Sequence, residues 1–145
     1  MVTNYGGLKM VENFDGWFNL AVFSILTLGW VFYTIQMLFF TQRFFDRFNI
    51  SHTGVIFGRL VGTFGLAAIA LHLVILFNGV EGSWHFFAYF VVQAAAAVIA
   101  SFVTVQQRVA ENEGVRYTAE PYLAPLVFGA AYGYLMFALQ AKLYA

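Results

Sequence analysis

The feature that most constrains this chain is the placement of its charged residues, which leave four long apolar stretches without Asp, Glu, Lys or Arg. The stretches cover residues 16–42, 60–80, 82–107 and 121–141. A helix that crosses a membrane needs about 20 mainly apolar residues. A backbone inside lipid must also satisfy its own hydrogen bonds, so each stretch is expected to be helical. The sequence therefore predicts four transmembrane helices.

Composition supports this class and excludes others. Charged residues make up 10% of the chain and hydrophobic residues 61%, whereas soluble domains carry about 25% charged residues. Seven Lys and Arg balance seven Asp and Glu, and this neutral balance argues against a nucleic-acid partner, which requires a basic surface. The absence of cysteine excludes a disulfide framework and cysteine-ligated metals.

We expect an all-α integral membrane protein with a single transmembrane domain over residues 1–145. Its helices are predicted at about 17–41, 54–78, 84–108 and 121–143, after a short polar segment at 1–16. Short connectors favour an antiparallel bundle of sequential neighbours. The positive-inside rule places both termini on the non-cytoplasmic side, or its organellar equivalent. One side holds most of the cations, namely Arg43, Arg47, Arg59, Arg108 and Arg116, and the other holds Lys9 and Lys142.

Small residues at helical spacing predict where helices pack. Gly54, Gly58, Gly62 and Gly65 share one face of the second predicted helix and include the pattern GxxxGxxxG. Such faces let two backbones approach closely inside a membrane. The same argument assigns packing faces to the third and fourth helices, through Gln93, Ala96 and Ala100 and through Gly129 and Gly133.

The remaining faces carry bulky aromatic side chains, which this pattern predicts to point outward. The chain contains 18 Phe residues, and the third helix presents Phe87, Phe90 and Phe102 opposite its small face. We expect this aromatic surface to contact lipid, other membrane subunits, or flat apolar ligands such as quinones, carotenoids or pigments.

Two histidines are candidate cofactor ligands. His72 lies inside the second predicted helix, and ionisable groups at membrane depth are functional candidates. His85 lies near the start of the third helix, where it is expected to face inward on the same side of the membrane. Together they could bind a haem or a chlorophyll-type pigment. The alternatives are a structural histidine, bonded to Gln93, Tyr89 or a carbonyl, and a proton relay.

The first connector carries Arg43, Asp46 and Arg47 at helical spacing, with phenylalanines between them. This pattern is typical of a short amphipathic helix at the membrane surface, and a solvated turn is the alternative. Arg43, Arg47 and Arg59 are therefore candidate membrane-surface residues. Arg59 is expected either to pair with Asp46 or to extend towards lipid phosphate.

No catalytic constellation is visible, and no carboxylate lies deep in a predicted span, so we do not expect an enzyme. The first hypothesis is an accessory or structural subunit of a larger membrane complex, respiratory or photosynthetic, that acts by helix packing and by contact with lipids or a cofactor. Its partners would be other membrane subunits and lipids. Its membrane would be the bacterial inner, the mitochondrial inner or the thylakoid membrane. The alternatives are a haem- or pigment-binding protein that uses His72, and a self-assembling transporter or channel with the glycine stripe at its oligomer interface.

Overall fold

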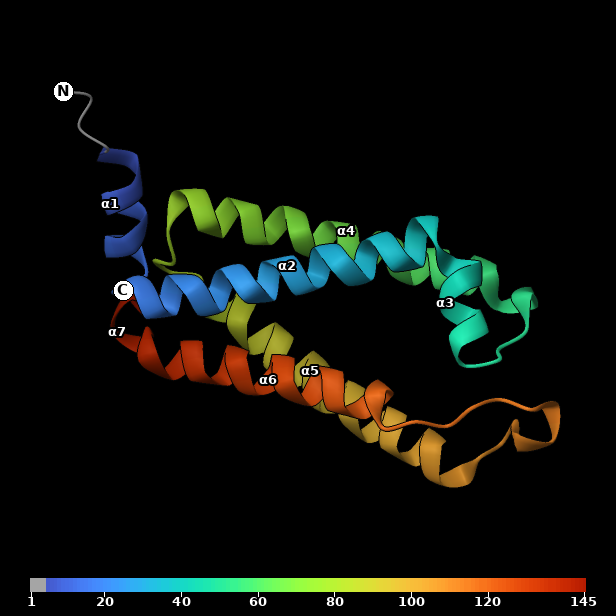
Figure 1. Ribbon diagram of the computed structural model, residues 1–145. Coiled ribbons are helices and arrows are strands. Elements are labelled where there is room, and N and C mark those ends of the chain that lie inside the picture. The colour runs from blue at the N-terminus through green and yellow to red at the C-terminus, as the bar shows by residue number, and fades with distance from the viewer. Residues whose placement is uncertain (1–4) are drawn as a thin grey trace.

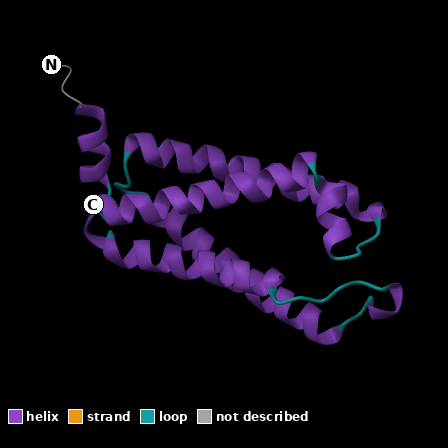
Figure 2. Cartoon of the chain, viewed as in Figure 1, coloured by secondary structure: helices purple, strands orange, loops and turns teal. Residues whose placement is uncertain are grey.

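The computed structural model describes residues 5–145, and in this part of the chain helices alternate with short loops and no strand is present (Figures 1 and 2). Short turns of 3₁₀ helix, η1 and η2, lie in the connectors. The elements in chain order are α1 (Tyr5–Asn13), α2 (Trp17–Phe39), α3 (Thr41–Arg47), η1 (His52–Gly54), α4 (Val55–Asn78), α5 (Trp84–Gln107), η2 (Glu111–Glu113), α6 (Glu120–Ala138) and α7 (Gln140–Leu143).

Four helical segments are long and apolar enough to cross a membrane, which confirms the predicted class. They are Trp17–Phe39, His52–Asn78, Trp84–Gln107 and Glu120–Ala138. The last one differs most from the predicted range of 121–143. The helix is interrupted at Leu139, and the chain continues as the separate short helix α7.

The long helices are arranged as two pairs. Helix α2 packs along α4, α5 packs along α6, and contacts between α2 and α6 join the pairs. Figure 1 shows the pairs close together near α1 and α7 and apart towards α3 and the loop after α5. One joining contact is a hydrogen bond of 2.9 Å from the Tyr134 hydroxyl to Asn19 Oδ1.

Glycines bring α4 directly against α2 and the start of α3. Gly58, Gly62 and Gly65 are buried. A Cβ atom added at Gly62 would lie 2.7 Å from Leu38 Cδ2, and one at Gly58 would lie 2.5 Å from Thr41 Cγ2. The stripe is therefore used inside the chain, where it is not available as the oligomer interface of the transporter hypothesis.

Helix α5 does not pack through the small face that we predicted. Gln93, Ala96 and Ala100 are exposed, whereas Phe87 and Phe90, which we expected to point outward, are buried, with exposed fractions of 0% and 2%. The prediction was wrong because it assumed that small residues mark helix contacts. Here phenylalanine rings fill the space where the two pairs meet, and Gln93 and Ala100 line the open space between the pairs beyond it.

The glycines predicted for the fourth helix differ in their surroundings. A Cβ atom added at Gly129 would lie 2.8 Å from the Cβ of Ala94, so α5 and α6 approach closely at this point. A Cβ atom added at Gly133 would have no neighbouring atom within 4 Å. Only the first position requires a glycine for packing.

An aromatic core fills the end where the pairs meet. The ring of Phe90 stacks on Tyr132 with 4.8 Å between centroids, and the ring of Phe86 meets the His72 ring at 4.9 Å. The Phe23 ring lies 5.2 Å from the His72 ring. Aromatic pairs of this kind stabilise a fold beyond the area that they bury. Part of the high aromatic content therefore forms a core, while Phe57, Phe64 and Phe137 stay exposed.

Polar contacts tie the chain ends together at the same end of the molecule. The backbone N–H of Gly82 donates to the carbonyl of Lys142 at 3.3 Å. The Lys142 ammonium lies 3.6 Å from the Asp15 carboxylate and also donates to the carbonyl of Glu12. These contacts hold α1, the turn between α4 and α5 and the C-terminal segment together at the end where the helix pairs meet.

Candidate functional site

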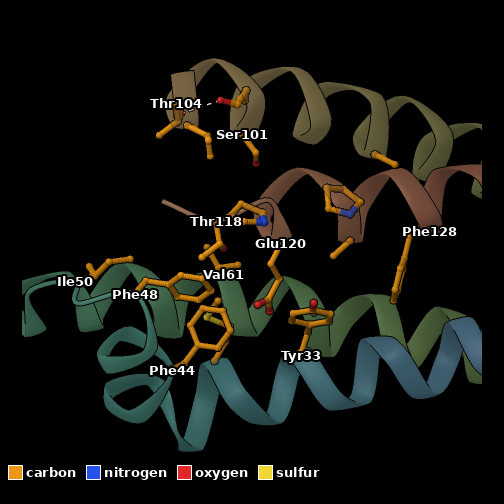
Figure 3. A pocket seen from close by; sticks show the side chains of 18 of the residues that line it. Tyr33, Phe44, Phe48, Ile50, Val61, Ser101, Thr104, Thr118, Glu120 and Phe128 are labelled. Atoms are coloured by element: carbon orange, nitrogen blue, oxygen red, sulfur yellow. Dashed lines mark hydrogen bonds between the residues drawn. The ribbon is translucent and has the colours of Figure 1, made fainter. Parts of the chain in front are cut away.

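A groove of about 750 Å³ lies between the two helix pairs (Figure 3). It exists because the two pairs meet mainly through α2 and α6, and α4 does not pack along α5. Residues of α2 and α4 form one wall, including Thr34, Met37, Val61 and Gly62. Side chains of α5 and α6 form the other, including Ala100, Ser101, Thr104, Ala124, Pro125 and Phe128.

The groove ends against the aromatic core on one side and against the connectors on the other. Trp30, Phe128 and Tyr132 line it at the core end. The Phe128 ring packs edge-on against Trp30, with 6.2 Å between centroids. Phe44 and Phe48 line it at the connector end. The lining is mainly apolar, and its charged residues, Arg116 and Glu120, lie at the connector end.

Polar contacts between the two connectors bridge the helix pairs at this second end. Arg47 Nη2 lies 2.8 Å from Glu120 Oε2. Asn49 Nδ2 donates to the Gly114 carbonyl at 2.8 Å, and the backbone N–H of Arg116 donates to the Phe48 carbonyl at 2.7 Å. The pairs are thus joined at both ends and separated between them.

The amphipathic helix predicted in the first connector is present as α3. It buries Thr41 and Phe45 against the fold. The Arg47 guanidinium lies over the rings of Phe44 and Phe48, 5.7 and 5.4 Å from their centroids. Its apolar residues therefore help to form the groove while its charges stay at the surface.

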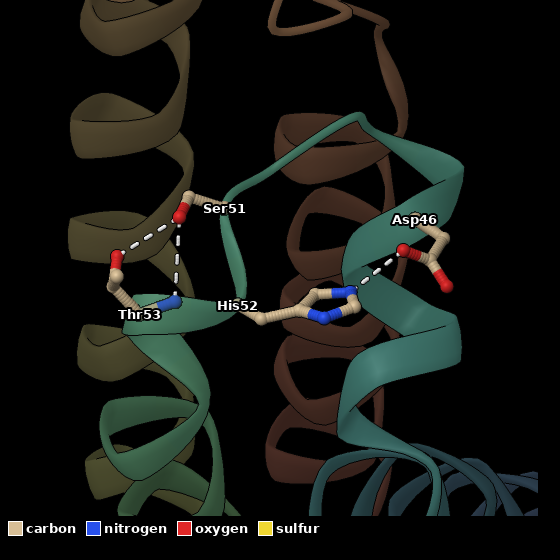
Figure 4. A network of polar contacts seen from close by, with 4 residues as sticks. All are labelled: Asp46, Ser51, His52 and Thr53. Carbon is tan, nitrogen blue, oxygen red and sulfur yellow. Dashed lines mark hydrogen bonds and ion pairs between the residues drawn. The ribbon is translucent and has the colours of Figure 1, made fainter.

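The other predicted surface residues are also placed by the structure. Arg43 and Arg59 are exposed. Asp46 does not pair with Arg59, because its Oδ1 lies 2.8 Å from Nε2 of the exposed His52 (Figure 4). The adjacent Ser51 Oγ accepts the backbone N–H of Thr53 at 3.3 Å, which begins η1.

His72 is fully buried, and both of its ring nitrogens have partners. Nδ1 lies 2.7 Å from the Ala68 carbonyl, and Nε2 lies 2.6 Å from the Tyr132 hydroxyl. A carbonyl only accepts, so these partners assign the proton to Nδ1 and make Nε2 the acceptor of the Tyr132 O–H. The same hydroxyl accepts Trp30 Nε1–H at 2.7 Å. The network joins α2, α4 and α6 where the helix pairs meet.

This arrangement leaves no His72 nitrogen to ligate a haem iron or a pigment magnesium. His85 does not face inward as expected: it is exposed, and its ring meets Trp84 edge-on with 5.9 Å between centroids. The structure therefore does not bring the two histidines together. The partner of His72 is Tyr132, a residue that the sequence pattern did not single out. Within residues 5–145, no group of three His, Asp or Glu side chains is placed to hold a metal ion.

Sequence reasoning also missed the groove itself. Its lining comes from four helices and two connectors, and no spacing along the chain marks such a set. Comparison with protein-family models, with curated proteins and with solved structures gives no match. The groove is therefore the feature of this chain that points most directly to a function.

Proposed function

We propose that this chain is a non-catalytic membrane protein that holds an apolar molecule from the bilayer, a lipid or a cofactor, between its two helix pairs. The supporting observation is the apolar groove of about 750 Å³. This volume lies within the range of about 300–1,000 Å³ that is typical of small-molecule sites. A cofactor in the groove would be held by shape and apolar contact, without His72 as a ligand.

In this proposal the four spans cross the membrane in alternating directions, with both termini on the non-cytoplasmic side. The support is the arginines of the connectors at the end away from α1 and α7, since cytoplasmic loops carry an excess of Lys and Arg. The groove then lies among the spans and opens sideways towards lipid. An apolar molecule could enter it without passing through water.

Filling the groove tests this function. Ala124 lines the groove, whereas Leu126 on the same helix is 52% exposed and lies outside the lining. We expect the protein purified from its own membrane to carry a bound apolar molecule that organic extraction recovers stoichiometrically. The variant Ala124→Phe should lose it and Leu126→Phe should keep it. Equal recovery from all three proteins, or none from the wild type, would contradict the proposal.

A second proposal is that the chain is an accessory subunit of a larger membrane complex. The observation that favours it is the row of exposed aromatic side chains on α4, where Phe57 is 70% and Phe64 is 68% exposed. Large exposed apolar patches mark lipid or protein contacts. Release in mild detergent at several hundred kilodaltons, with other proteins co-migrating, is the expected result. Release at the 16.3 kDa monomer mass plus detergent would contradict this second proposal.

A further inference from the structure

We propose that the molecule in the groove is a phospholipid, with an acyl chain between the helix pairs and its phosphate bound by Arg116. This inference rests on the proposed function. It goes further by naming the class of ligand and the residue that recognises its head group. Three observations support it: the free charge at the end of the groove, the length of the groove, and its volume.

The free charge is the Arg116 guanidinium at the connector end. Arg116 lines the groove and is exposed, and it forms no ion pair with any residue that the structure describes. The carboxylate of Glu120, which also lines the groove, forms its ion pair with Arg47 at 2.8 Å and not with Arg116. A guanidinium binds phosphate through two parallel hydrogen bonds.

The length of the groove matches one leaflet of a bilayer. Along α6 the lining extends from Pro121 to Tyr132, which is roughly 17 Å at about 1.5 Å rise per residue. Half of a hydrocarbon core is about 15 Å. Arg116 lies beyond the start of α6, in the connector. A phosphate at Arg116 would therefore sit at head-group depth while its acyl chain follows the groove towards the centre.

The volume favours a lipid chain over a partner helix. Along the roughly 17 Å of the groove, a helix about 10 Å wide occupies roughly 1,300 Å³. The groove offers about 750 Å³, which suits a lipid chain. A neutral flat molecule could fit the same space, but it would not use the free charge of Arg116.

Quenching of Trp30 tests the inference, because Trp30 lines the groove. The background is the full chain with Trp17→Phe and Trp84→Phe, which leaves Trp30 as the only fluorescent indole. In neutral detergent the protein is titrated with phosphatidylglycerol brominated in its acyl chains, and separately with diacylglycerol that carries the same chains. The variant is Arg116→Gln, and its matched control is Arg59→Gln, which changes an exposed arginine outside the groove lining. The variant Ala124→Phe places a large ring in the groove and tests whether quenching requires the groove to be open.

We expect phosphatidylglycerol to quench Trp30 at about tenfold lower concentration than diacylglycerol, because only its phosphate can form charge-assisted hydrogen bonds with the Arg116 guanidinium. Arg116→Gln should remove this difference, Arg59→Gln should preserve it, and Ala124→Phe should abolish quenching. If Arg116→Gln and Arg59→Gln weaken quenching by phosphatidylglycerol equally, the inference is overturned. Equal quenching by both lipids would overturn it too, and would leave the proposed function standing with a neutral ligand. No quenching by either lipid would overturn both.

Discussion

Removing one hydroxyl from the junction of the helix pairs should destabilise the whole fold. Tyr132→Phe keeps the ring that stacks on Phe90 but deletes the oxygen that bonds His72 Nε2 at 2.6 Å and Trp30 Nε1 at 2.7 Å. His72 is completely buried, so its nitrogen would find no replacement in water. The substitution thus removes two interhelical hydrogen bonds and leaves a buried acceptor unpaired.

The size of the effect follows from those two bonds. Interhelical hydrogen bonds inside membranes contribute about 0.6 kcal/mol on average and about 1.7 kcal/mol at most. Two such bonds give about 1–3 kcal/mol. Because 1.4 kcal/mol corresponds to about a tenfold change, the unfolding equilibrium constant should rise roughly 5- to 140-fold.

Equilibrium unfolding in mixed detergent micelles, with increasing sodium dodecyl sulfate and helicity as the signal, measures this loss. The matched control is Tyr89→Phe, which removes a hydroxyl from a residue that is 64% exposed on α5 and should leave the transition unchanged. If Tyr132→Phe unfolds at the same detergent fraction as Tyr89→Phe and the wild type, the network does not hold the helix pairs together.

Two further substitutions test the packing and the connector contact in the same assay. Gly62→Ala places a Cβ atom 2.7 Å from Leu38 Cδ2, and this overpacking should lower the free energy of unfolding by about 1–2 kcal/mol. The control Gly133→Ala meets no atom within 4 Å and should be neutral or stabilising by up to about 1 kcal/mol. Similar losses of stability in the two variants would show that close packing at Gly62 does not matter. Glu120→Gln breaks the exposed ion pair with Arg47 and should lower the free energy of unfolding by less than about 1 kcal/mol. In 1 M salt, screening should largely remove this difference from the wild type. A larger loss of stability that does not depend on salt would contradict this prediction.

The sequence predicted the spans because charged side chains mark where the chain leaves the membrane. Asp15, Arg43, Glu81 and Arg108 each lie outside the helices that cross. The glycine face of α4 was also predictable, since four glycines at helical spacing have few other uses in an apolar helix. Its partner helix was not predictable, because nothing in the spacing selects α2 over a second copy of the chain.

The orientation of α5 and the environment of His72 could not be derived from the sequence, for one shared reason. Phe87 and Phe90 are as suitable for lipid as for a core, so only the surrounding rings decide which way α5 turns. Tyr132 meets His72 from 60 residues further along the chain, and no local pattern records such a pairing. The groove between the pairs depends on both of these facts.

The central claim is that the helix pairs stay apart between the aromatic core and the connector contacts and leave the groove open there. Because the chain contains no cysteine, introduced cysteine pairs report this directly by oxidative cross-linking in the native membrane. Phe102→Cys with Tyr122→Cys joins α5 and α6 within one pair, where the two rings meet edge-on with 5.6 Å between centroids. Val61→Cys with Ala124→Cys spans the groove. We predict rapid disulfide formation in the first pair and none in the second, whereas equal cross-linking in both would show a closed bundle without a groove.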